Sequence, residues 1–201
     1  DILDLSKHSS IPIINGLSDL YHPCQALTDI FSIKEKLGKC EGITLSYIGD
    51  GNNVCHSLLL GCAKVGMNIQ VATPKGYEAD DVIIKQAQKY AQISGSKIKL
   101  TNDPVEGIKD ADAIYADVWV SMGQEEESKE RLKLFEEYQV NNTLVGHASP
   151  HYIFMHCLPA HRGQEVTADI IDGEHSIVFD QAENRLHTQK AIMIFLMNPN
   201  I

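Results

Sequence analysis

Positive charge is scarce in this 201-residue sequence. It has 17 lysine and arginine residues against 27 aspartate and glutamate residues, which gives a formal net charge of −10 at pH 7. Aromatic residues make up 6% of the chain, and no basic stripe interleaves with them. Proteins that bind the phosphate backbone of nucleic acids need such a basic surface. We therefore expect no nucleic-acid partner.

Long apolar runs are also absent. The longest, over residues 191–197, is far shorter than the roughly 20 residues that a membrane-spanning helix requires. The first residues lack the charged-then-apolar layout of a secretory signal. We expect a soluble protein with no membrane partner. Because the chain begins at Asp1 and not at a methionine, we also expect that an upstream segment is missing from it.

The five cysteines form no regular framework and include no Cys-x-x-Cys pair. A chain of this size does not depend on disulfides, so we expect reduced thiols in the cytoplasm, or in an organellar matrix if the source is eukaryotic. One stretch raises the alternative of a metal site, but Pro150 keeps its first two histidines off a common helical face, and we expect no metal. That stretch contains His147, His151, His156, Cys157 and His161.

Short apolar runs alternate with helix-like stretches, which is typical of a parallel β-sheet with helices on both faces. The predicted fold class is therefore α/β. Polar clusters follow several of the strands, and ligands of open α/β sheets bind at the carboxyl ends of strands, so we expect the site at that edge. We predict strands over residues 43–48, 69–72, 97–100, 113–116 and 152–155, and helices over residues 53–65, 79–91 and 124–138.

Two segments fit this layout poorly. Residues 11–14 (IPII) resemble a strand that precedes the first helix. Residues 181–198 predict a terminal helix that is apolar around much of its circumference. Each of these segments predicts a packing partner that the chain does not contain.

Two motifs after predicted strands could bind a ligand, and each also has a structural interpretation. GDGNN, residues 49–53, opens a helix whose backbone donors could hold an anion, but Asn52 and Asn53 could equally cap that helix. It lacks the third glycine of a dinucleotide-binding fingerprint. In DVWVSMGQ, residues 117–124, Asp117 could receive an ammonium group, or it could cap a turn while Met122 fills a gap in the core.

Three further motifs are equally open. In HPCQ, residues 22–25, the imidazole and amide could face a pocket at the start of a helix, although a proline there is also ordinary helix architecture. In HCLP, residues 156–159, the neighbouring imidazole could lower the pKa of Cys157, or Cys157 could be a buried structural cysteine. Arg185 suits a phosphate, but also an ordinary surface salt bridge.

Together and in this order, HPCQ, GDGNN, DVWVSMGQ, HCLP and AENR resemble the ornithine carbamoyltransferase family, and the resemblance covers essentially the whole chain. The family also has an amino-terminal half, with a Ser-Thr-Arg-Thr-Arg phosphate-binding motif and the trimer contacts, that this sequence lacks. The resemblance implies three parts: residues 1–24, a remnant of the carbamoyl-phosphate domain with a connecting segment; residues 25–180, a Rossmann-like ornithine-binding domain; and residues 181–201, a helix that returns to the missing half.

The resemblance also implies a set of residues that bind carbamoyl phosphate. His22 and Gln25 would contact the carbamoyl group as donors and stabilise the charge that develops on its oxygen. Arg185 would contact carbamoyl phosphate. The backbone carbonyl of Leu158 would accept a hydrogen bond from the attacking amine or the carbamoyl nitrogen, and Cys157 of the same loop belongs to this set.

For ornithine, the resemblance implies that Asn53 binds the main-chain groups while Ser121 and Met122 close over the substrate and exclude water. Asp117 and Cys157 would anchor the α-amino group and orient the side-chain amine, with Cys157 acting as a positioning thiolate. The catalytic residues implied in this way are Cys157, Asp117, His22 and Gln25.

The implied reaction transfers the carbamoyl group of carbamoyl phosphate to the side-chain amine of ornithine and yields citrulline and phosphate. It needs no metal or organic cofactor, because carbamoyl phosphate is already activated and catalysis depends on orientation and charge stabilisation. Activity should rise towards alkaline pH, since the attacking amine must be deprotonated. The chain alone would be inactive, because complete family members add the other half and form homotrimers or multiples of trimers.

Several alternatives stay open. The VSMG sequence at residues 120–123 favours ornithine over the aspartate and putrescine that related enzymes use. A partial chain does not distinguish ornithine from its acetylated or succinylated forms. A non-catalytic amino-acid-binding module would also explain a chain with half of the phosphate site, although the joint presence of Cys157, Asp117 and Arg185 favours an enzyme.

Overall fold

A parallel five-stranded β-sheet forms the centre of the molecule. A computed structural model describes residues 2–120 and 128–197 of the chain. The strands lie in the order β3-β2-β1-β4-β5, and every neighbouring pair is parallel. This confirms the predicted α/β class. The strands are β1 (Thr44–Ile48), β2 (Asn68–Ala72), β3 (Ile98–Thr101), β4 (Ala113–Ala116) and β5 (Ile153–His156).

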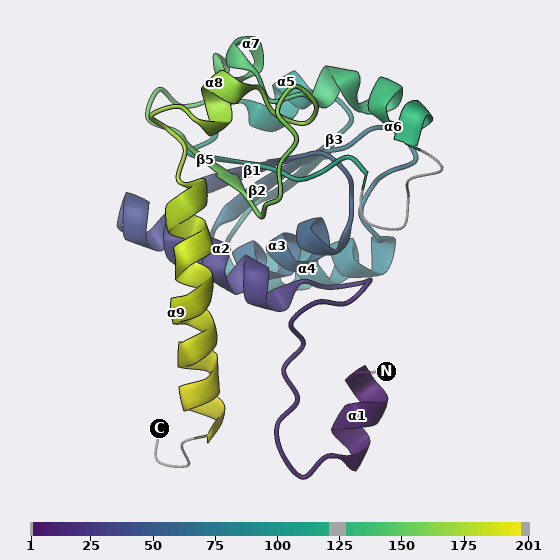
Figure 1. The fold of residues 1–201 in the computed structure, drawn as a ribbon, viewed down its shortest axis with the longest axis vertical. Helices are drawn as coiled ribbons and strands as arrows, with labels where there is room; N and C mark the ends of the chain where they lie inside the picture. Colours follow the sequence, from purple (N-terminus) through teal and green to yellow (C-terminus); the bar gives the residue numbers. More distant parts are fainter. Residues whose placement is uncertain (1, 121–127, 198–201) are drawn as a thin grey trace.

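Helices cover both faces of the sheet (Figure 1). Helices α2 (Pro23–Leu37), α3 (Asn53–Lys64) and α4 (Asp81–Ser94) lie on one face. The other face carries α5 (Pro104–Ile108), α6 (Ser128–Phe135), the 3-10 helix Glu136–Tyr138, α7 (Asn142–Val145) and α8 (Ala168–Ile171). Side chains alternate along each strand, so β1 sends Leu45 and Tyr47 into one apolar cluster and Ile48 into the other. The core is therefore two layers separated by the sheet.

Local sequence signals explain where several helices begin and end. Asn52, Asp80 and Asn141 cap α3, α4 and α7 by accepting hydrogen bonds from backbone N–H groups of the first turn. Glycines in the left-handed conformation, Gly38 and Gly95, end α2 and α4. Asn52 and Asp80 follow β1 and β2, so their caps lie on the carboxyl side of the sheet, whereas Gly38 and Gly95 precede β1 and β3.

The predicted elements agree closely with the observed ones. Each of the five predicted strands lies within one residue of an observed strand at both ends. The helices predicted over residues 53–65 and 79–91 correspond to α3 and α4. The helix predicted over residues 124–138 is different: α6 starts at Ser128 and passes into a 3-10 turn, and residues 121–127 lie outside the described part.

Both ends of the described chain extend away from the body (Figure 1). Helix α1 (Ile2–His8) was not predicted, and the strand predicted at residues 11–14 is wrong, because this segment has no regular structure. A strand needs a neighbour for its backbone hydrogen bonds, and Ile11, Ile13 and Ile14 are exposed beside none of the described strands.

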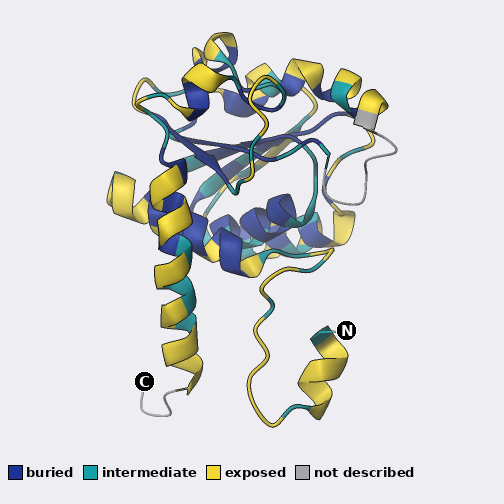
Figure 2. Cartoon of the chain, in the orientation of Figure 1, coloured by how far each residue is buried: buried dark blue, intermediate teal, exposed yellow. Residues whose placement is uncertain are grey.

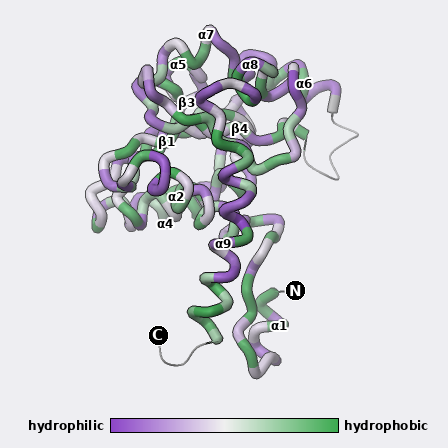
Figure 3. Tube along the Cα trace, turned by 60° about the vertical axis from the view of Figure 1, so that its left-hand side comes forward, coloured by the Kyte–Doolittle hydropathy of each residue, from purple (hydrophilic) through white to green (hydrophobic). Residues whose placement is uncertain are grey.

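The predicted terminal helix is present as α9 (Val178–Met197). Its first half packs against α2 and β5, and its second half projects from the body and is exposed (Figure 2). Figure 3 shows that this projecting part is largely hydrophobic. Within the described residues, no helix combines the length and the apolar character needed to span a membrane.

Candidate functional site

The loops that follow β1 and β2 meet at the carboxyl edge of the sheet. The backbone N–H of Gly51 donates to the Tyr77 carbonyl oxygen at 2.8 Å. A Cβ atom on residue 51 would collide with the Ala79 backbone nitrogen and lie 2.6 Å from the Tyr77 carbonyl oxygen. The second glycine of GDGNN is therefore required by a close backbone approach.

The two asparagines of GDGNN have different partners. The side-chain oxygen of Asn52 caps α3 by accepting from the Val54 and Cys55 N–H groups, and its amide donates to Asp117 Oδ2 at 2.7 Å. The amide of Asn53 donates instead to the Ser18 carbonyl oxygen at 2.7 Å. The capping interpretation therefore applies to Asn52 and not to Asn53. A role for Asn53 in binding ornithine stays a prediction.

Asp117 and Cys157 lie in direct contact at the ends of β4 and β5. The Cys157 thiol donates to Asp117 Oδ1 at 2.9 Å, and the Val118 N–H donates to the same oxygen at 2.8 Å. Asp117 is 4% exposed. The structure thus brings together a buried carboxylate and a thiol that the sequence separates by 40 residues.

The protonation of Cys157 differs from the expected thiolate. Burial, followed by the charge and hydrogen bond of Asp117, raises the pKa of the Cys157 thiol well above its usual value. The neighbouring imidazole does not oppose this, because His156 Nδ1 accepts the Leu158 N–H at 2.8 Å while Nε2 faces Glu165. The structure therefore favours a neutral thiol that donates to Asp117.

Leu158 follows Cys157 with a strained backbone. Its φ of 58° lies in the left-handed region, which branched residues rarely adopt. The hydrogen bond from the Leu158 N–H to His156 holds this conformation. Such strain is typical of backbone that is positioned for a ligand, and the role of the Leu158 carbonyl stays a prediction.

Arg131 on α6 contacts the loops that follow β1 and β4, and none of the sequence motifs includes it. The side chain is 3% exposed, pairs with Asp50, and donates from Nε to the Trp119 carbonyl oxygen at 2.7 Å. Its guanidinium also lies 4.7 Å from the centre of the Tyr77 ring. The only local sign of a special role for Arg131 was that it is the one arginine of α6.

Ser121 and Met122, the residues expected to close over the substrate, lie outside the described residues.

The start of α2 and the middle of α9 bring Gln25 and Arg185 together. Arg185 Nη1 donates to Gln25 Oε1, and Gln25 Nε2 donates to Asp29 Oδ1 at 2.8 Å. Because a guanidinium has no acceptor, the atom of Gln25 that faces Arg185 must be the oxygen. In this arrangement the side-chain oxygen of Gln25 faces Arg185, and the expected contact of Gln25 with the carbamoyl group stays a prediction.

His22 stands beside this pair as a neutral imidazole. Burial and the positive charge of Arg185 lower the pKa of His22, against smaller opposing effects of the Gly16 backbone and Asp117. His22 Nδ1 and Arg185 Nε are both buried, and neither has a hydrogen-bond partner among the described protein atoms. Buried polar atoms are rarely left unpaired, so these two mark a place for the polar groups of a ligand.

The histidine-rich stretch does not assemble a metal site in the described part of the chain. Across residues 2–120 and 128–197, no three His, Cys, Asp or Glu side chains are grouped closely enough to hold a metal ion. The side chains of His156 and Glu165 are instead fully buried, with 3.5 Å between His156 Nε2 and Glu165 Oε1.

These loops give the protein its class. An open parallel sheet gathers a carboxylate, a thiol, an imidazole and a guanidinium at its carboxyl edge, which is the arrangement of an α/β protein that binds small polar molecules.

Comparison with known proteins identifies the family. Residues 41–196 match the aspartate/ornithine carbamoyltransferase Asp/Orn binding domain, and residues 1–35 match the carbamoyl-P binding domain of the same family. The chain belongs to the aspartate/ornithine carbamoyltransferase family. This confirms the resemblance found in the sequence motifs.

Relatives that match this chain closely are considerably longer than it. It is 59% identical to ornithine carbamoyltransferase of Thermococcus kodakarensis, over 98% of this chain and 62% of the relative. Against the Bacillus subtilis enzyme of the same name it is 60% identical, over 94% and 60%. The solved structure of the Pyrococcus furiosus enzyme superimposes with a TM-score of 0.95 at 56% identity, over 98% and 63%. The chain thus spans less than two thirds of each relative.

Proposed function

We propose that this chain is the ornithine-binding part of an ornithine carbamoyltransferase, which transfers the carbamoyl group of carbamoyl phosphate to the side-chain amine of ornithine. The observation that carries the proposal is the contact between Asp117 and Cys157 at the carboxyl edge, close to His22 and Arg185. The similar proteins of Thermococcus kodakarensis, Bacillus subtilis and Pyrococcus furiosus are ornithine carbamoyltransferases, which supports the same activity.

Carbamoyl phosphate would lie between the start of α2 and α9. The Arg185 guanidinium supplies positive charge for the phosphate, and its unpaired Nε supplies a further donor. Neutral His22 can donate to the carbamoyl oxygen as charge develops there. The oxygen of Gln25, in turn, can accept from the carbamoyl nitrogen once Arg185 turns to the phosphate.

Ornithine would approach from the ends of β1, β4 and β5. The Asp117 carboxylate supplies the negative charge that an ammonium group needs, and Asn52, Val118 and Cys157 hold it in place. The deprotonated side-chain amine then attacks the carbamoyl carbon. A carbon–nitrogen bond forms, the carbon–oxygen bond to phosphate breaks, and the nitrogen loses a proton. We propose that Asn53, Ser121, Met122 and Leu158 complete the substrate contacts.

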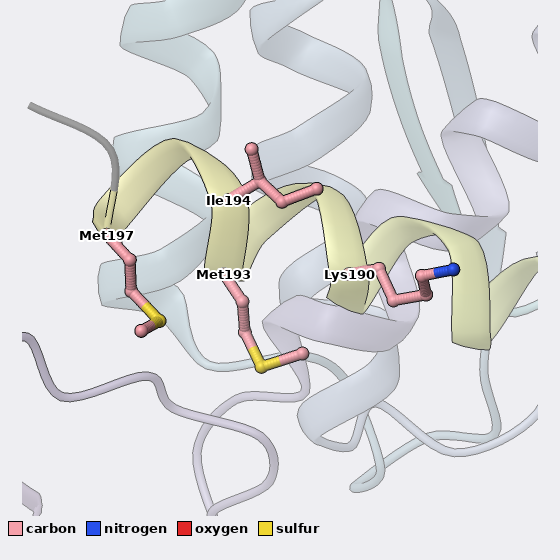
Figure 4. Close-up of a pocket in the computed structure, with 4 residues that line it drawn as sticks. All are labelled: Lys190, Met193, Ile194 and Met197. Carbon is pink, nitrogen blue, oxygen red and sulfur yellow. The ribbon is translucent and has the colours of Figure 1, made fainter. Parts of the chain in front are cut away.

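The projecting ends would contact the part of the enzyme that the longer relatives carry ahead of this chain. Lys190, Met193, Ile194 and Met197 of α9 (Figure 4) line a hollow of ≈ 480 Å³ that lies away from the strand edge. Exposed apolar patches of this kind mark interaction sites. The division into residues 1–24, 25–180 and 181–201, and a homotrimeric assembly, belong to this proposal.

The location that fits this proposal is a reducing compartment, the cytoplasm or an organellar matrix. All five cysteines are free, and three of them are buried. Free buried thiols are ordinary where thiols stay reduced.

The decisive experiment measures citrulline formation by two proteins. One is this chain alone, and the other is this chain joined to the amino-terminal segment of the Pyrococcus furiosus relative. Ornithine, acetylated and succinylated ornithine, putrescine and aspartate serve as parallel acceptors. We expect activity only from the joined protein, with ornithine, and rising towards alkaline pH.

The other outcomes are equally informative. Preference for another acceptor would replace ornithine in the proposal. Full activity of the chain alone would show that the phosphate site is already complete. If the joined protein carbamoylates none of the acceptors, the result would favour a non-catalytic binding module.

A further inference from the structure

Asp29 is a fully buried carboxylate that the proposed chemistry does not use. It lies on α2, four residues after Gln25, where α2 packs against α9 (Figure 1). Its side chain is 0% exposed. One oxygen, Oδ1, accepts from Gln25 Nε2 at 2.8 Å and from Gln181 Nε2 at 2.7 Å, while Oδ2 has no partner among the described atoms.

The hydrogen bonds of Asp29 connect three motifs that are far apart in the sequence. Through Gln25 it reaches Arg185, and through Gln181 it reaches the His156 backbone N–H, which donates to Gln181 Oε1 at 3.0 Å. HPCQ, HCLP and AENR therefore share one buried acceptor. Gln181 lies 152 residues after Asp29, so the tertiary fold alone creates this network.

A negative charge at this position is costly. Burial raises the pKa of Asp29 to about 7, although hydrogen bonds from Gln25, Gln181 and Tyr115 and the charge of Arg185 oppose the rise. Cys62 and Cys157, the other titratable groups that sense this charge, supply no positive charge to offset it. A neutral side chain of the same shape would hold the helices together at lower cost. The packing of α2 against α9 therefore does not explain why a carboxylate, and not a neutral side chain, occupies this position.

A carboxylate does, however, differ from an amide in one respect that matters to Gln25. When it is ionised, above about pH 7, it can only accept, so it accommodates the nitrogen of the Gln25 amide and rejects the oxygen. Arg185 enforces the same orientation from the opposite side. When Arg185 binds phosphate, as proposed above, Asp29 becomes the remaining group that orients Gln25.

We propose that Asp29 is a positioning residue for carbamoyl transfer, which holds the oxygen of Gln25 towards the ligand and so selects a carbamoyl nitrogen with its N–H donors. This inference rests on the proposed function. It assigns Asp29 to the carbamoyl phosphate side of the reaction and not to the binding of ornithine.

The test compares Asp29→Asn with the wild type in the joined protein described above. Asparagine keeps the shape and one acceptor, but its amide can donate to Gln25 and permit the opposite orientation. We expect kcat/KM for carbamoyl phosphate to fall about tenfold or more, and KM for ornithine to stay unchanged. The matched control is Asp112→Asn, at the amino edge of the sheet, where the carboxylate accepts the Thr44 N–H at 2.9 Å.

Thermal unfolding at two pH values separates this role from a structural one. The folded-state pKa of Asp29 lies above the ordinary carboxyl value, so its contribution to stability is complete at low pH and is lost as the pH rises through about 7. Asp29→Asn removes the ionisable group, and with it this loss of stability at higher pH. Between about pH 5 and pH 8 its unfolding temperature should fall less than that of the wild type.

Four outcomes would decide the role of Asp29. An unchanged kcat/KM, or a lower kcat/KM together with a lower unfolding temperature at both pH values, would overturn the role of Asp29. If the wild type binds carbamoyl phosphate in calorimetry but carbamoylates no acceptor, the proposed function fails alone, and weaker binding by Asp29→Asn still supports the inference. A wild type that does not bind carbamoyl phosphate would overturn both.

Discussion

The protonation of Cys157 depends on a residue that lies 40 positions earlier in the chain. A cysteine beside a histidine often has a lowered pKa, and the motif HCLP suggests this. In the folded chain the imidazole of His156 is committed to the Leu158 N–H, while the Asp117 carboxylate faces the sulfur. Adjacency in the sequence therefore does not show which group controls the protonation of the thiol, and the role of Cys157 in the reaction stays a prediction.

Replacing Asp117 with asparagine should make Cys157 more reactive. The substitution removes the negative charge that disfavours the thiolate, and each unit by which the thiol pKa falls gives about a tenfold rise in the thiolate fraction. We expect alkylation by iodoacetamide at neutral pH to accelerate about tenfold, as measured by mass spectrometry of the peptide that contains Cys157.

Cys40 provides the internal control for this measurement. Burial raises the pKa of its thiol as well, but Asp117 is not among the groups that affect it. Its alkylation rate should be the same in both proteins. Equal rates at Cys157 would show that Asp117 does not control the thiol.

Two buried charged residues were not recognised from the sequence. Arg131 stands in a helix of lysines and glutamates, and Asp29 stands in an amphipathic helix, so both read as surface residues. Each is buried because a partner from a distant segment reaches it: Asp50 for Arg131, and Gln181 for Asp29. The lone arginine of α6 was a local signal, but no local pattern identifies the distant partner of either residue.

At the scale of elements, the strands were the most predictable part of the molecule. Most are short, largely apolar runs bounded by glycine, proline or polar residues, as burial on both faces of a parallel sheet requires. The edge strand β3 is the exception, because Lys99 and Leu100 are exposed. The run at residues 11–14 has the same composition but pairs with none of the described strands. Composition therefore predicts which segments can form strands, and the presence of a neighbouring strand decides which do.

Gly51→Ala should test how the loop after β1 is held. The added Cβ would overlap backbone atoms of residues 77–79, which cannot withdraw without moving the loop after β2. We expect a loss of about 3 kcal/mol in the free energy of unfolding, measured by urea denaturation.

Gly16→Ala is the matched control, because no atom lies within 4 Å of its Cβ position. It should change the free energy of unfolding by less than about 0.5 kcal/mol. A similar small effect of Gly51→Ala would mean that the two loops separate readily.

At the scale of the whole molecule, apolar side chains remain exposed on both projecting segments. Ile11 and Leu17 are exposed before α2, and Met193, Phe195 and Met197 are exposed on α9 (Figures 2 and 3). Scattered apolar residues are normal on a protein surface, but two neighbouring projections of this kind need a covering partner. The greater length of the relatives agrees with such a partner.

Lysine at Met193 and Met197 should reduce self-association of the chain alone. These residues line the hollow on α9, and charge there opposes apolar contact between copies. We expect light scattering to report a smaller mean particle mass for the double variant. The control is Val82→Lys on α4, which is 70% exposed and away from that hollow. An equal effect of the control would point to net charge, and not to this surface.

By itself, the sequence determined the α/β class, the positions of the five strands along the chain and the motifs that identify the family. Those properties depend on side chains within a few residues of one another, where the helical and strand periods act. The tertiary structure alone decided that Asn52 contacts Asp117, that the Cys157 thiol donates to Asp117 and that the Gln25 oxygen faces Arg185. Hydrogen bonds and burial join residues up to 160 positions apart at this site, and their geometry exists only once the sheet and helices have packed.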